Sequence, residues 1–226
     1  MLRVNKPNLM IHAQHADFYV IEKPAGLNFH SEGGPGFVVL AEQQLNEKLY
    51  AVHRLDKVTS GLIILARSSA SAAEFTRLFT AHEIDKFYLA LSDSKPKKKQ
   101  GWVKGDMAKS RRSSFKLLKS IDNPAITRFY SLSVAANLRA FILKPYSGKT
   151  HQLRVALKSL AAPILGDSLY GGTSAERTYL HAYALCFSWQ NQQHRYVCKP
   201  ECTTLFGQLT EHENFHTWQQ PWQLDW

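Results

Sequence analysis

Apolar and polar residues alternate along this chain in a pattern that predicts several short strands and a few helices. Strands are predicted over residues 17–22, 62–66, 87–91, 127–134, 139–144, 182–189 and 194–199. Helical spacing of apolar residues predicts helices over residues 37–49, from the Ser68 cap to residue 82, and over 149–160. Because no strand–helix–strand rhythm is present, we expect an α+β fold on a mostly antiparallel sheet flanked by helices and loops.

The simplest domain organisation is one domain over residues 1–226, with a core from about residue 15 to residue 200. A chain of this length can bury a core without disulfides or metals. Residues 201–226 form a C-terminal extension that begins with a capped helical pattern and ends in three tryptophans, Trp218, Trp222 and Trp226. These tryptophans cover either the core or a partner.

Composition indicates a cytoplasmic, monomeric protein that uses no metal or cofactor. No apolar run approaches the roughly 20 residues needed to span a bilayer, and the first seven residues lack the features of a signal peptide. Three cysteines, Cys186, Cys198 and Cys202, are an odd number and argue against a disulfide framework. With His194 they could suggest a metal site, but the Cys198–Cys202 spacing is loose. Cys186 is expected to be a small core residue of the strand over residues 182–189, so a buried thiol is favoured.

Positive charge is concentrated in one segment. Residues 95–119 contain ten Lys or Arg and a single acid, Asp106, so they carry nine of the ten net positive charges of the chain. Such a segment indicates a polyanionic partner, since Lys and Arg contacts to phosphates release counterions. The alternative is a solvated loop. Trp102, Phe115 and small residues lie among the charges, which favours a surface that contacts nucleic acid.

One nine-residue stretch, His53 to Gly61, places a carboxylate among cations and hydroxyls directly before an apolar run. Arg54 and Lys57 can hold Asp56 ionised, because a nearby cation lowers the pKa of an aspartate. The turn-forming residues that follow predict a loop positioned by a rigid strand, which is a common place for catalytic residues. Taken alone, the stretch is compatible equally with a catalytic aspartate and with an aspartate that caps a turn.

The chain resembles the RluA-type pseudouridine synthases, which isomerise uridine in RNA. The family signature His-Arg-Leu-Asp-x-x-Thr-Ser-Gly is similar to residues 53–61. Five further motifs follow the family order: Lys23-Pro24-Ala25-Gly26, Lys86-Phe87-Tyr88, the segment 147–156, Gly166-Asp167-Ser168-Leu169-Tyr170-Gly171-Gly172, and Leu180-His181-Ala182. Lys149 replaces the usual Arg and Ala156 the usual His. Because few residues precede Asp17, we expect a catalytic domain without the S4-type RNA-binding domain that some relatives carry.

The resemblance implies the pseudouridine synthase fold on a bent sheet, and catalysis by Asp56 as nucleophile or as a base on the sugar. It implies that Arg154 faces Asp56 and that Tyr88 stacks on the uracil. Arg54 is expected to fill the position of the flipped base. On a helix from Lys149, Arg154 and Thr150 would share a face. The wider expected RNA-contact set is His53, Thr59, Lys97, Lys98, Lys99, Arg111, Arg112, Lys149 and His151.

Two other functions remain as alternatives. A hydrolase could use His53, Asp56 and Ser60, but true triads draw their members from separated elements and no Gly-x-Ser-x-Gly motif occurs. A non-catalytic RNA-binding module could retain the motif as scaffold, but it would be expected to have lost Asp56, Tyr88 or Arg154. The sequence therefore predicts a synthase that acts on ribosomal or transfer RNA.

Overall fold

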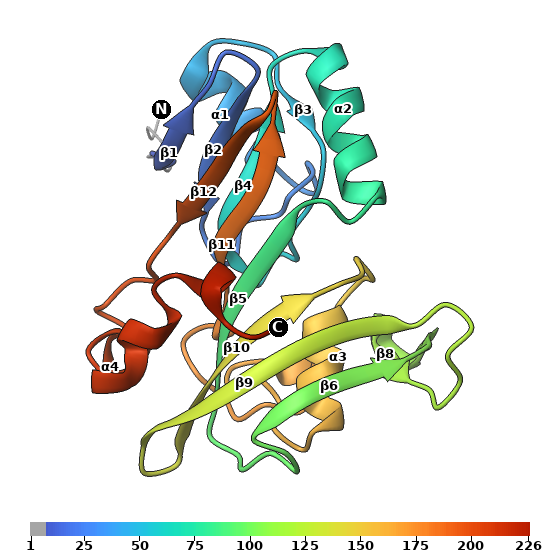
Figure 1. Cartoon of the computed structure of the whole chain (residues 1–226), viewed down its shortest axis with the longest axis vertical. Coiled ribbons are helices and arrows are strands. Elements are labelled where there is room, and N and C mark those ends of the chain that lie inside the picture. The colour runs from blue at the N-terminus through green and yellow to red at the C-terminus, as the bar shows by residue number, and fades with distance from the viewer. Residues whose placement is uncertain (1–7) are drawn as a thin grey trace. The chain divides into compact units, whose positions relative to one another are not determined.

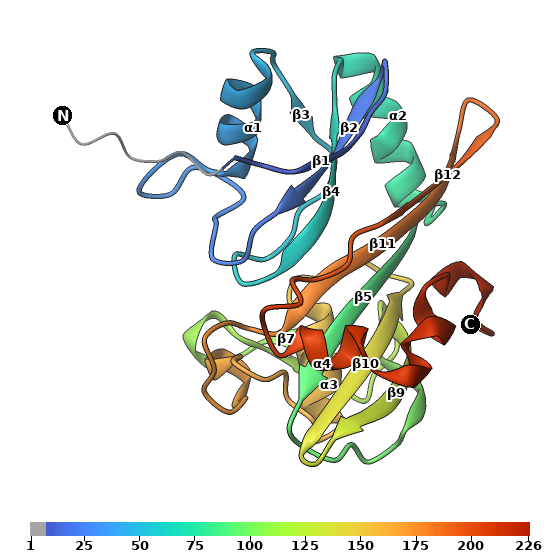
Figure 2. The same cartoon turned by 90° about the vertical axis from the view of Figure 1, so that its left-hand side faces the viewer.

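The computed structural model of the chain describes residues 8–226. They belong to two compact units, Met1–Glu83 (unit 1) and Ile84–Trp226 (unit 2), whose elements are labelled in Figure 1 and seen from a second side in Figure 2. The first seven residues, on which the prediction about a signal peptide rests, lie outside the described range. Within that range, no helix combines the length and hydropathy that crossing a bilayer requires. The single-domain organisation stays a prediction.

Unit 1 is a small antiparallel sheet with two helices. Its elements are β1 (Ile11–Gln14), β2 (Phe18–Lys23), α1 (Phe37–Leu45), β3 (Tyr50–Ala51), β4 (Ser60–Ala66) and α2 (Ser69–Thr80). Strand β2 lies between β1 and β4, and β3 also pairs with β4. All seven residues of β4 are buried, and α2 packs on this sheet through the edge-to-face contact of Phe75 with Phe18. The strand that follows Asp56 is therefore the rigid centre of unit 1.

The helices of unit 1 begin and end where their caps place them. Helix α2 begins at the predicted Ser68 cap, which forms a reciprocal capping box with Ser71. Helix α1 is shorter than predicted, because Asn46 adopts a left-handed conformation (φ 53°) and its N–H bonds the Glu42 carbonyl. The predicted helix over residues 37–49 is thus correct in place and wrong at its end.

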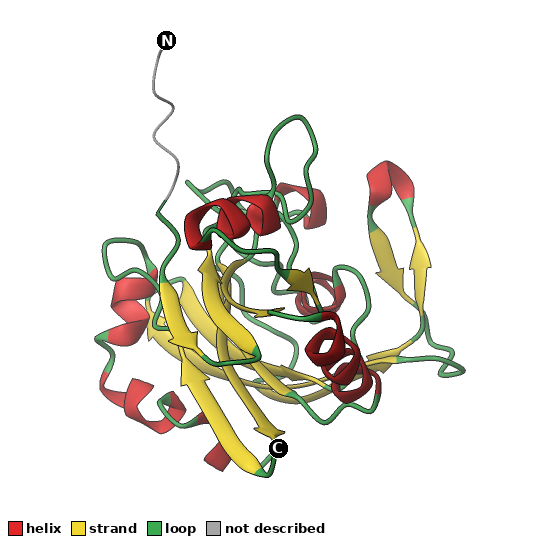
Figure 3. Ribbon diagram, turned by 90° about the horizontal axis from the view of Figure 1, so that it is seen from above, coloured by secondary structure: helices red, strands yellow, loops and turns green. Residues whose placement is uncertain are grey.

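Unit 2 is built on a longer antiparallel sheet. Its strands are β5 (Asp85–Ser92), β6 (Gln100–Gly105), β9 (Ala125–Ala135), β10 (Leu138–Pro145), β11 (Leu180–Trp189) and β12 (Gln192–Val197), in the order β12-β11-β5-β10-β9-β6. A separate hairpin consists of β7 (Met107–Lys109) and β8 (Phe115–Leu117), with the 3₁₀ turn η1 (Arg111–Ser113) at its tip. In Figure 3 this hairpin, with its helical tip, stands out from the other strands.

The two faces of the unit 2 sheet are covered by different elements. Helix α3 (Gln152–Ser159) lies on the face to which Thr127 points, because the Gln152 side chain donates to the Thr127 hydroxyl at 3.0 Å. The C-terminal segment (red in Figure 2) lies on the opposite face, where Trp226 contacts Phe87 and Tyr130. It contains α4 (Phe206–Thr210), η3 (Glu213–Trp218) and η4 (Pro221–Gln223). The tryptophan-rich extension therefore covers the core of its own unit.

Two predictions for unit 2 need correction. Helix α3 begins at Gln152 and not at Lys149, because His151 is left-handed (φ 57°) and cannot belong to the helix. Thr150 is consequently outside the helix, and the expectation that it shares a helical face with Arg154 is wrong. Strands β6, β7 and β8 were not predicted, although they lie inside the basic segment 95–119. The predicted mostly antiparallel architecture is confirmed by every pairing within the two units.

Candidate active site

The Asp56 loop of unit 1, residues 53–59, connects the short strand β3 to β4. Arg54 and Lys57 are exposed, Asp56 is half-buried and Thr59 is buried. The Asp56 carbonyl accepts the N–H of Thr59 at 3.0 Å, which closes a tight turn. Leu55 is 5% exposed and anchors the loop in the core between its two charged neighbours. The carboxylate thus sits on a well-fixed turn beside two cations that face solvent.

Lys23 fixes this loop from beneath. It is completely buried, and its ammonium donates to the carbonyls of Pro24 (2.9 Å), Leu27 (2.8 Å) and Lys57 (3.1 Å). The Lys57 carbonyl also accepts the Gly26 N–H at 2.8 Å. A buried ammonium is tolerated because its hydrogen bonds are made by fixed acceptors. The Lys-Pro-x-Gly turn and the Asp56 loop are therefore one hydrogen-bonded assembly, a role of Lys23 that sequence reasoning missed.

His53 and Gly61 set the path of the chain on either side of the carboxylate. The His53 Nε2 accepts the N–H of Ile64 at 2.8 Å, so the neutral ring carries its proton on Nδ1, and the ring packs on Phe79. This bond orients the loop on β4. Gly61 has φ 107°, a conformation that side chains disfavour, and it pairs with Lys23 across β2 and β4. The signature motif thus has a glycine at this position because the backbone conformation favours one.

Tyr88 lies in the middle of β5, with Leu143 of β10 opposite it on one side and Ala182 of β11 on the other. Leu143 is in turn opposite Phe129 of β9, and directly opposed residues point to the same face of a sheet. Phe129 is two residues from Thr127, which points to α3. Tyr88 therefore points to the face that α3 covers, and the small Ala182 of the Leu-His-Ala motif is its neighbour.

Lys86 lies two residues before Tyr88 and so points to the same face of β5. Burial lowers the pKa of the Lys86 ammonium below its ordinary value, and the charge of Asp85 opposes that shift. The Lys-x-Tyr motif thus places a partly dehydrated cation beside the tyrosine. Its spacing of two residues was the sequence signal for this arrangement, although the sequence analysis gave Lys86 no role.

Arg154 on α3 forms a buried ion pair with Asp167. Nε donates to Oδ2 at 2.7 Å and Nη2 donates to Oδ1 at 2.8 Å, while the two side chains are 6% and 1% exposed. The guanidinium carbon also lies 4.9 Å from the centroid of the Tyr170 ring. Such a two-pronged pair holds a guanidinium in one orientation. Because a guanidinium has five N–H donors, Arg154 has others besides the two that Asp167 accepts.

The Gly-Asp-x-x-Tyr-Gly-Gly motif builds the turn that presents Asp167 and Tyr170. Gly166 has φ 78°, and a Cβ there would lie 1.8 Å from the Arg177 carbonyl oxygen, so only glycine fits. The Tyr170 hydroxyl bonds the Nδ1 of His151 at 2.8 Å and accepts the N–H of Phe115 at 3.0 Å. One hydroxyl therefore links the start of α3 to the β7–β8 hairpin.

The ten cations of the basic segment are all exposed. Its single acid, Asp106, has a structural role: the carboxylate accepts the N–H groups of Asp122 (3.1 Å) and Asn123 (2.8 Å). A hydrogen bond from the Ser120 side chain lowers the pKa of the Asp106 carboxyl, and these two backbone N–H groups act in the same direction. The Lys149 ammonium donates to the Asn123 side chain at 2.7 Å. The segment is thus an ordered surface that presents positive charge.

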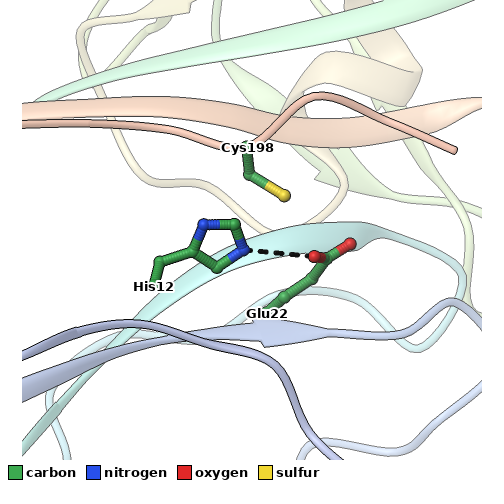
Figure 4. Close-up of side chains that lie close together, drawn as sticks. All are labelled: His12, Glu22 and Cys198. Atoms are coloured by element: carbon green, nitrogen blue, oxygen red, sulfur yellow. Dashed lines mark hydrogen bonds and ion pairs between the residues drawn. The ribbon is translucent and has the colours of Figure 1, made fainter.

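Two side chains of unit 1 that could ligate a metal ion lie next to each other: His12 of β1 and Glu22 of β2 form an ion pair, with Nε2 and Oε2 3.2 Å apart (Figure 4). The prediction that Cys186 is a core residue is wrong in degree, because Cys186 is half-buried and packs against the core, whereas Cys198 is buried and Cys202 is exposed.

The two units divide the expected site residues between them. Unit 1 brings together Asp56 with its flanking residues His53, Arg54 and Thr59. Unit 2 places Tyr88 on the α3 face of its sheet and Arg154 on α3 itself. Lys149 and His151 lie on the loop before that helix, and the cations of the basic segment lie on β6, the β7–β8 hairpin and their flanking loops.

Three comparisons with known proteins agree. Residues 17–159 match the family model described as RNA pseudouridylate synthase. An uncharacterized RNA pseudouridine synthase of Haemophilus influenzae is 56% identical over 83% of this chain and 85% of its own. The dual-specificity RNA pseudouridine synthase RluA of Salmonella typhi is 33% identical over 80% and 87%. The structure named human RNA pseudouridylate synthase domain containing 4 has a TM-score of 0.72 and 26% identity, over 88% of this chain and 90% of that one.

Proposed function

The chain belongs to the RNA pseudouridylate synthase family and is an RNA pseudouridine synthase; on that premise we propose that Asp56 is its catalytic carboxylate. The observation that carries the proposal is the Asp56 loop. It places a half-buried carboxylate between two exposed cations, on a turn that the buried ammonium of Lys23 anchors. An anchored loop holds a reacting group in place without reorganisation.

The reaction moves the uracil from nitrogen to carbon. The bond between N1 and the ribose C1′ breaks, the uracil turns, and a bond from C5 to C1′ forms while C5 loses a proton and N1 gains one. Asp56 acts on the ribose, either by attacking C1′ or by removing a sugar proton. The half-buried Tyr88 stacks on the uracil, and its hydroxyl takes or gives a proton during the isomerisation.

Arg154 supplies a positive charge for the reacting carboxylate. Its ion pair with Asp167 holds the guanidinium in one orientation, as a preset cation in an active site requires. Arg54 is exposed beside Asp56, as expected for a planar cation that occupies the position of the flipped uridine. Flipping costs least where the uridine is already unpaired, so we propose loops of structured ribosomal or transfer RNA as substrates.

The basic segment supplies affinity for the RNA backbone. Its ten exposed Lys and Arg side chains lie on ordered strands and turns, and Lys97, Lys98, Lys99, Arg111 and Arg112 are among them. Phosphate contacts position an RNA without reading its sequence. His53 and Thr59 shape the Asp56 loop, and Lys149 and His151 shape the loop before α3. We include these four residues with the cations in the proposed RNA surface.

The test is Asp56→Asn, measured by tritium release from RNA that contains 5-³H-uridine. We expect turnover to fall by at least about a thousandfold while the affinity for RNA and the unfolding temperature stay close to those of the wild type. Asp17→Asn is the matched control, since Asp17 is also a half-buried aspartate of unit 1 but lies outside the loop. Normal turnover by Asp56→Asn would overturn the assignment.

A further inference from the structure

Trp102 is an unusual surface residue. Four large apolar side chains are exposed in the described part of the chain, Met10, Ile11, Trp102 and Ile121, and the tryptophan is the only aromatic one. It keeps 39% of its surface exposed. The exposed part of the Trp102 ring is a large, flat apolar surface that faces solvent.

Cations and a second aromatic ring surround this side chain. The Lys104 ammonium lies 4.7 Å from the centroid of the Trp102 ring, and the Arg128 guanidinium carbon lies 5.2 Å from it. The centroid of the Tyr146 ring is 5.2 Å away, at an interplanar angle of 42°. We name these four residues, Trp102, Lys104, Arg128 and Tyr146, the Trp102 platform.

The Trp102 platform and Tyr88 lie on opposite faces of the same sheet. Trp102 of β6 is directly opposite Arg128 of β9, which is directly opposite Lys144 of β10. The neighbouring row runs from Gly101 through Phe129 and Leu143 to Tyr88. Adjacent rows of a pleated sheet point to opposite faces, so the platform is separate from the face that α3 covers.

The position of the platform leaves it accessible. Strand β6 is the last strand of the unit 2 sheet, and the C-terminal segment covers the same face further along, where Trp226 packs on Tyr130 and Phe87. Lys104 is exposed, and Arg128 and Tyr146 are half-buried. The C-terminal segment thus covers part of this face of the sheet and leaves the Trp102 platform accessible.

The contacts of Arg128 are not those of a residue placed for stability alone. Its Nε is buried and makes no hydrogen bond with any of residues 8–226, while its Nη2 donates to the Tyr130 hydroxyl at a long 3.3 Å. A buried N–H without an acceptor costs free energy and calls for an explanation. The Arg128 guanidinium is thus held against the Trp102 ring with one buried N–H that has no acceptor among residues 8–226.

We infer that the Trp102 platform binds an unpaired base of the RNA substrate, outside the site that isomerises uridine. A base stacks on the exposed part of the Trp102 ring, and Lys104 and Arg128 bind the phosphates on either side of it. Aromatic side chains flanked by cations bind single-stranded nucleic acid in this way, because every base presents a flat face and two phosphates. This inference rests on RNA being the substrate of the enzyme.

The chemistry of the platform also says how selective the contact is. Stacking uses the face of a base and leaves its hydrogen-bonding edge unread, so the platform accepts any base in a single strand. It does not accept a base within a duplex, whose faces are covered by its neighbours. The platform therefore adds affinity for RNAs that have an unpaired nucleotide in addition to the target uridine.

The test compares a short single-stranded RNA with an abasic ribose-phosphate oligomer of equal length, both titrated into the full chain. Wild type should bind the RNA more tightly than the abasic oligomer. Trp102→Ala should weaken RNA binding by about five- to a hundredfold and leave abasic binding nearly unchanged, whereas Trp102→Phe should keep most of the difference. Trp222→Phe is the control. Trp222 lies in the C-terminal segment and also faces a cation, since the guanidinium carbon of Arg195 on β12 is 5.2 Å from its ring centroid.

Salt dependence separates the two parts of the platform. Arg128→Gln should reduce the slope of log affinity against log salt by about 0.7, whereas Trp102→Ala should leave the slope unchanged. In turnover assays on structured RNA, Trp102→Ala should raise KM and leave kcat at the wild-type value, so failure here is distinct from the loss of turnover expected at Asp56. If Trp102→Ala binds RNA as wild type does, or weakens RNA and abasic binding equally, the inference is overturned.

Discussion

The Asp56 loop of unit 1 and the α3 helix of unit 2 are both anchored by a buried charged residue, but in different ways. Under the loop, the Lys23 ammonium binds three main-chain carbonyls and so fixes the path of the backbone. Beneath the helix, the Asp167 carboxylate binds the Arg154 guanidinium itself and fixes a side chain. One anchor holds the loop that carries a functional group, and the other holds the functional group directly.

This difference fits the two tasks that we propose. A carboxylate that reacts with the ribose must be delivered to the right place and then change its bonding, so a fixed backbone is the useful constraint. A cation that only stabilises charge works best when its orientation is set beforehand, which a two-pronged buried ion pair achieves. Lys23 binds main-chain carbonyls, whereas Asp167 binds a side chain. Replacing Lys23 and replacing Asp167 should therefore have different effects on stability and turnover.

The largest expected effect is at Asp167. Asp167→Leu should lower the free energy of unfolding by about 3–5 kcal/mol, because it removes the carboxylate that forms a two-pronged ion pair with the buried Arg154 charge. Urea unfolding followed by circular dichroism measures this change. A loss below about 1 kcal/mol would show that Arg154 does not depend on Asp167, and the comparison would fail.

A double variant separates stability from chemistry at the same pair. Replacing a buried ion pair by apolar residues is often neutral, so Arg154→Met combined with Asp167→Leu should recover most of the stability lost by Asp167→Leu alone. Turnover should stay absent, because the cation is gone. Recovery of turnover in the double variant would contradict the role proposed for Arg154.

A smaller and more local effect is expected at Lys23. Lys23→Met removes the ammonium from three carbonyls, of which the Lys57 carbonyl keeps the N–H of Gly26. Leaving buried carbonyls without donors should cost about 1–3 kcal/mol, and turnover should fall further than this loss of folded protein explains. Lys48→Met is the control, because this lysine of unit 1 is exposed and lies outside the Asp56 loop.

Hydrogen exchange locates the defect. In Lys23→Met, exchange of the Thr59 amide, which bonds the Asp56 carbonyl, should accelerate, while amides of β10 should exchange at the wild-type rate. Equal acceleration in both units would mean that Lys23 stabilises the molecule generally and that its action on the Asp56 loop is not specific.

The sequence predicted most strands of the two units and failed where local conformation or tertiary contacts decide. Runs such as residues 62–66 are apolar on both faces, so their burial was evident. The start of α3 was placed three residues early, because nothing in the sequence marks His151 as left-handed. Strand β6 was hidden because its period-two pattern, with Val103 buried between the exposed Trp102 and Lys104, lies within a charged segment.

The candidate site shows the same limit. Motifs identified Asp56, Tyr88 and Arg154, because the resemblance assigns roles to those positions. The sequence analysis named Asp167 and Lys23 only as parts of motifs and gave them no roles. Asp167 lies 13 residues from Arg154, and Lys23 lies 34 residues from Lys57, whose carbonyl it binds in the Asp56 loop. Their function depends on which atoms the fold brings within hydrogen-bonding distance, and no local pattern carries that information.

The smallest change in stability is expected at Lys86. Unlike Lys23 and Asp167, which anchor other groups, Lys86 carries a charge whose burial destabilises the folded protein. The pKa of Lys86 is lowered by burial, so Lys86→Met should raise the free energy of unfolding at neutral pH by about 1 kcal/mol and lower turnover, as expected where function opposes stability. Between the lowered pKa and the ordinary value near 10.5, the unfolded wild type binds more protons than the folded one. Wild-type stability therefore rises with pH in that window, and the advantage of Lys86→Met should shrink toward pH 10.5. Urea unfolding at pH 7, 9 and 10 measures this, with the exposed Lys199→Met as control. An advantage that stays constant across pH would show that the lysine is fully solvated in the folded protein.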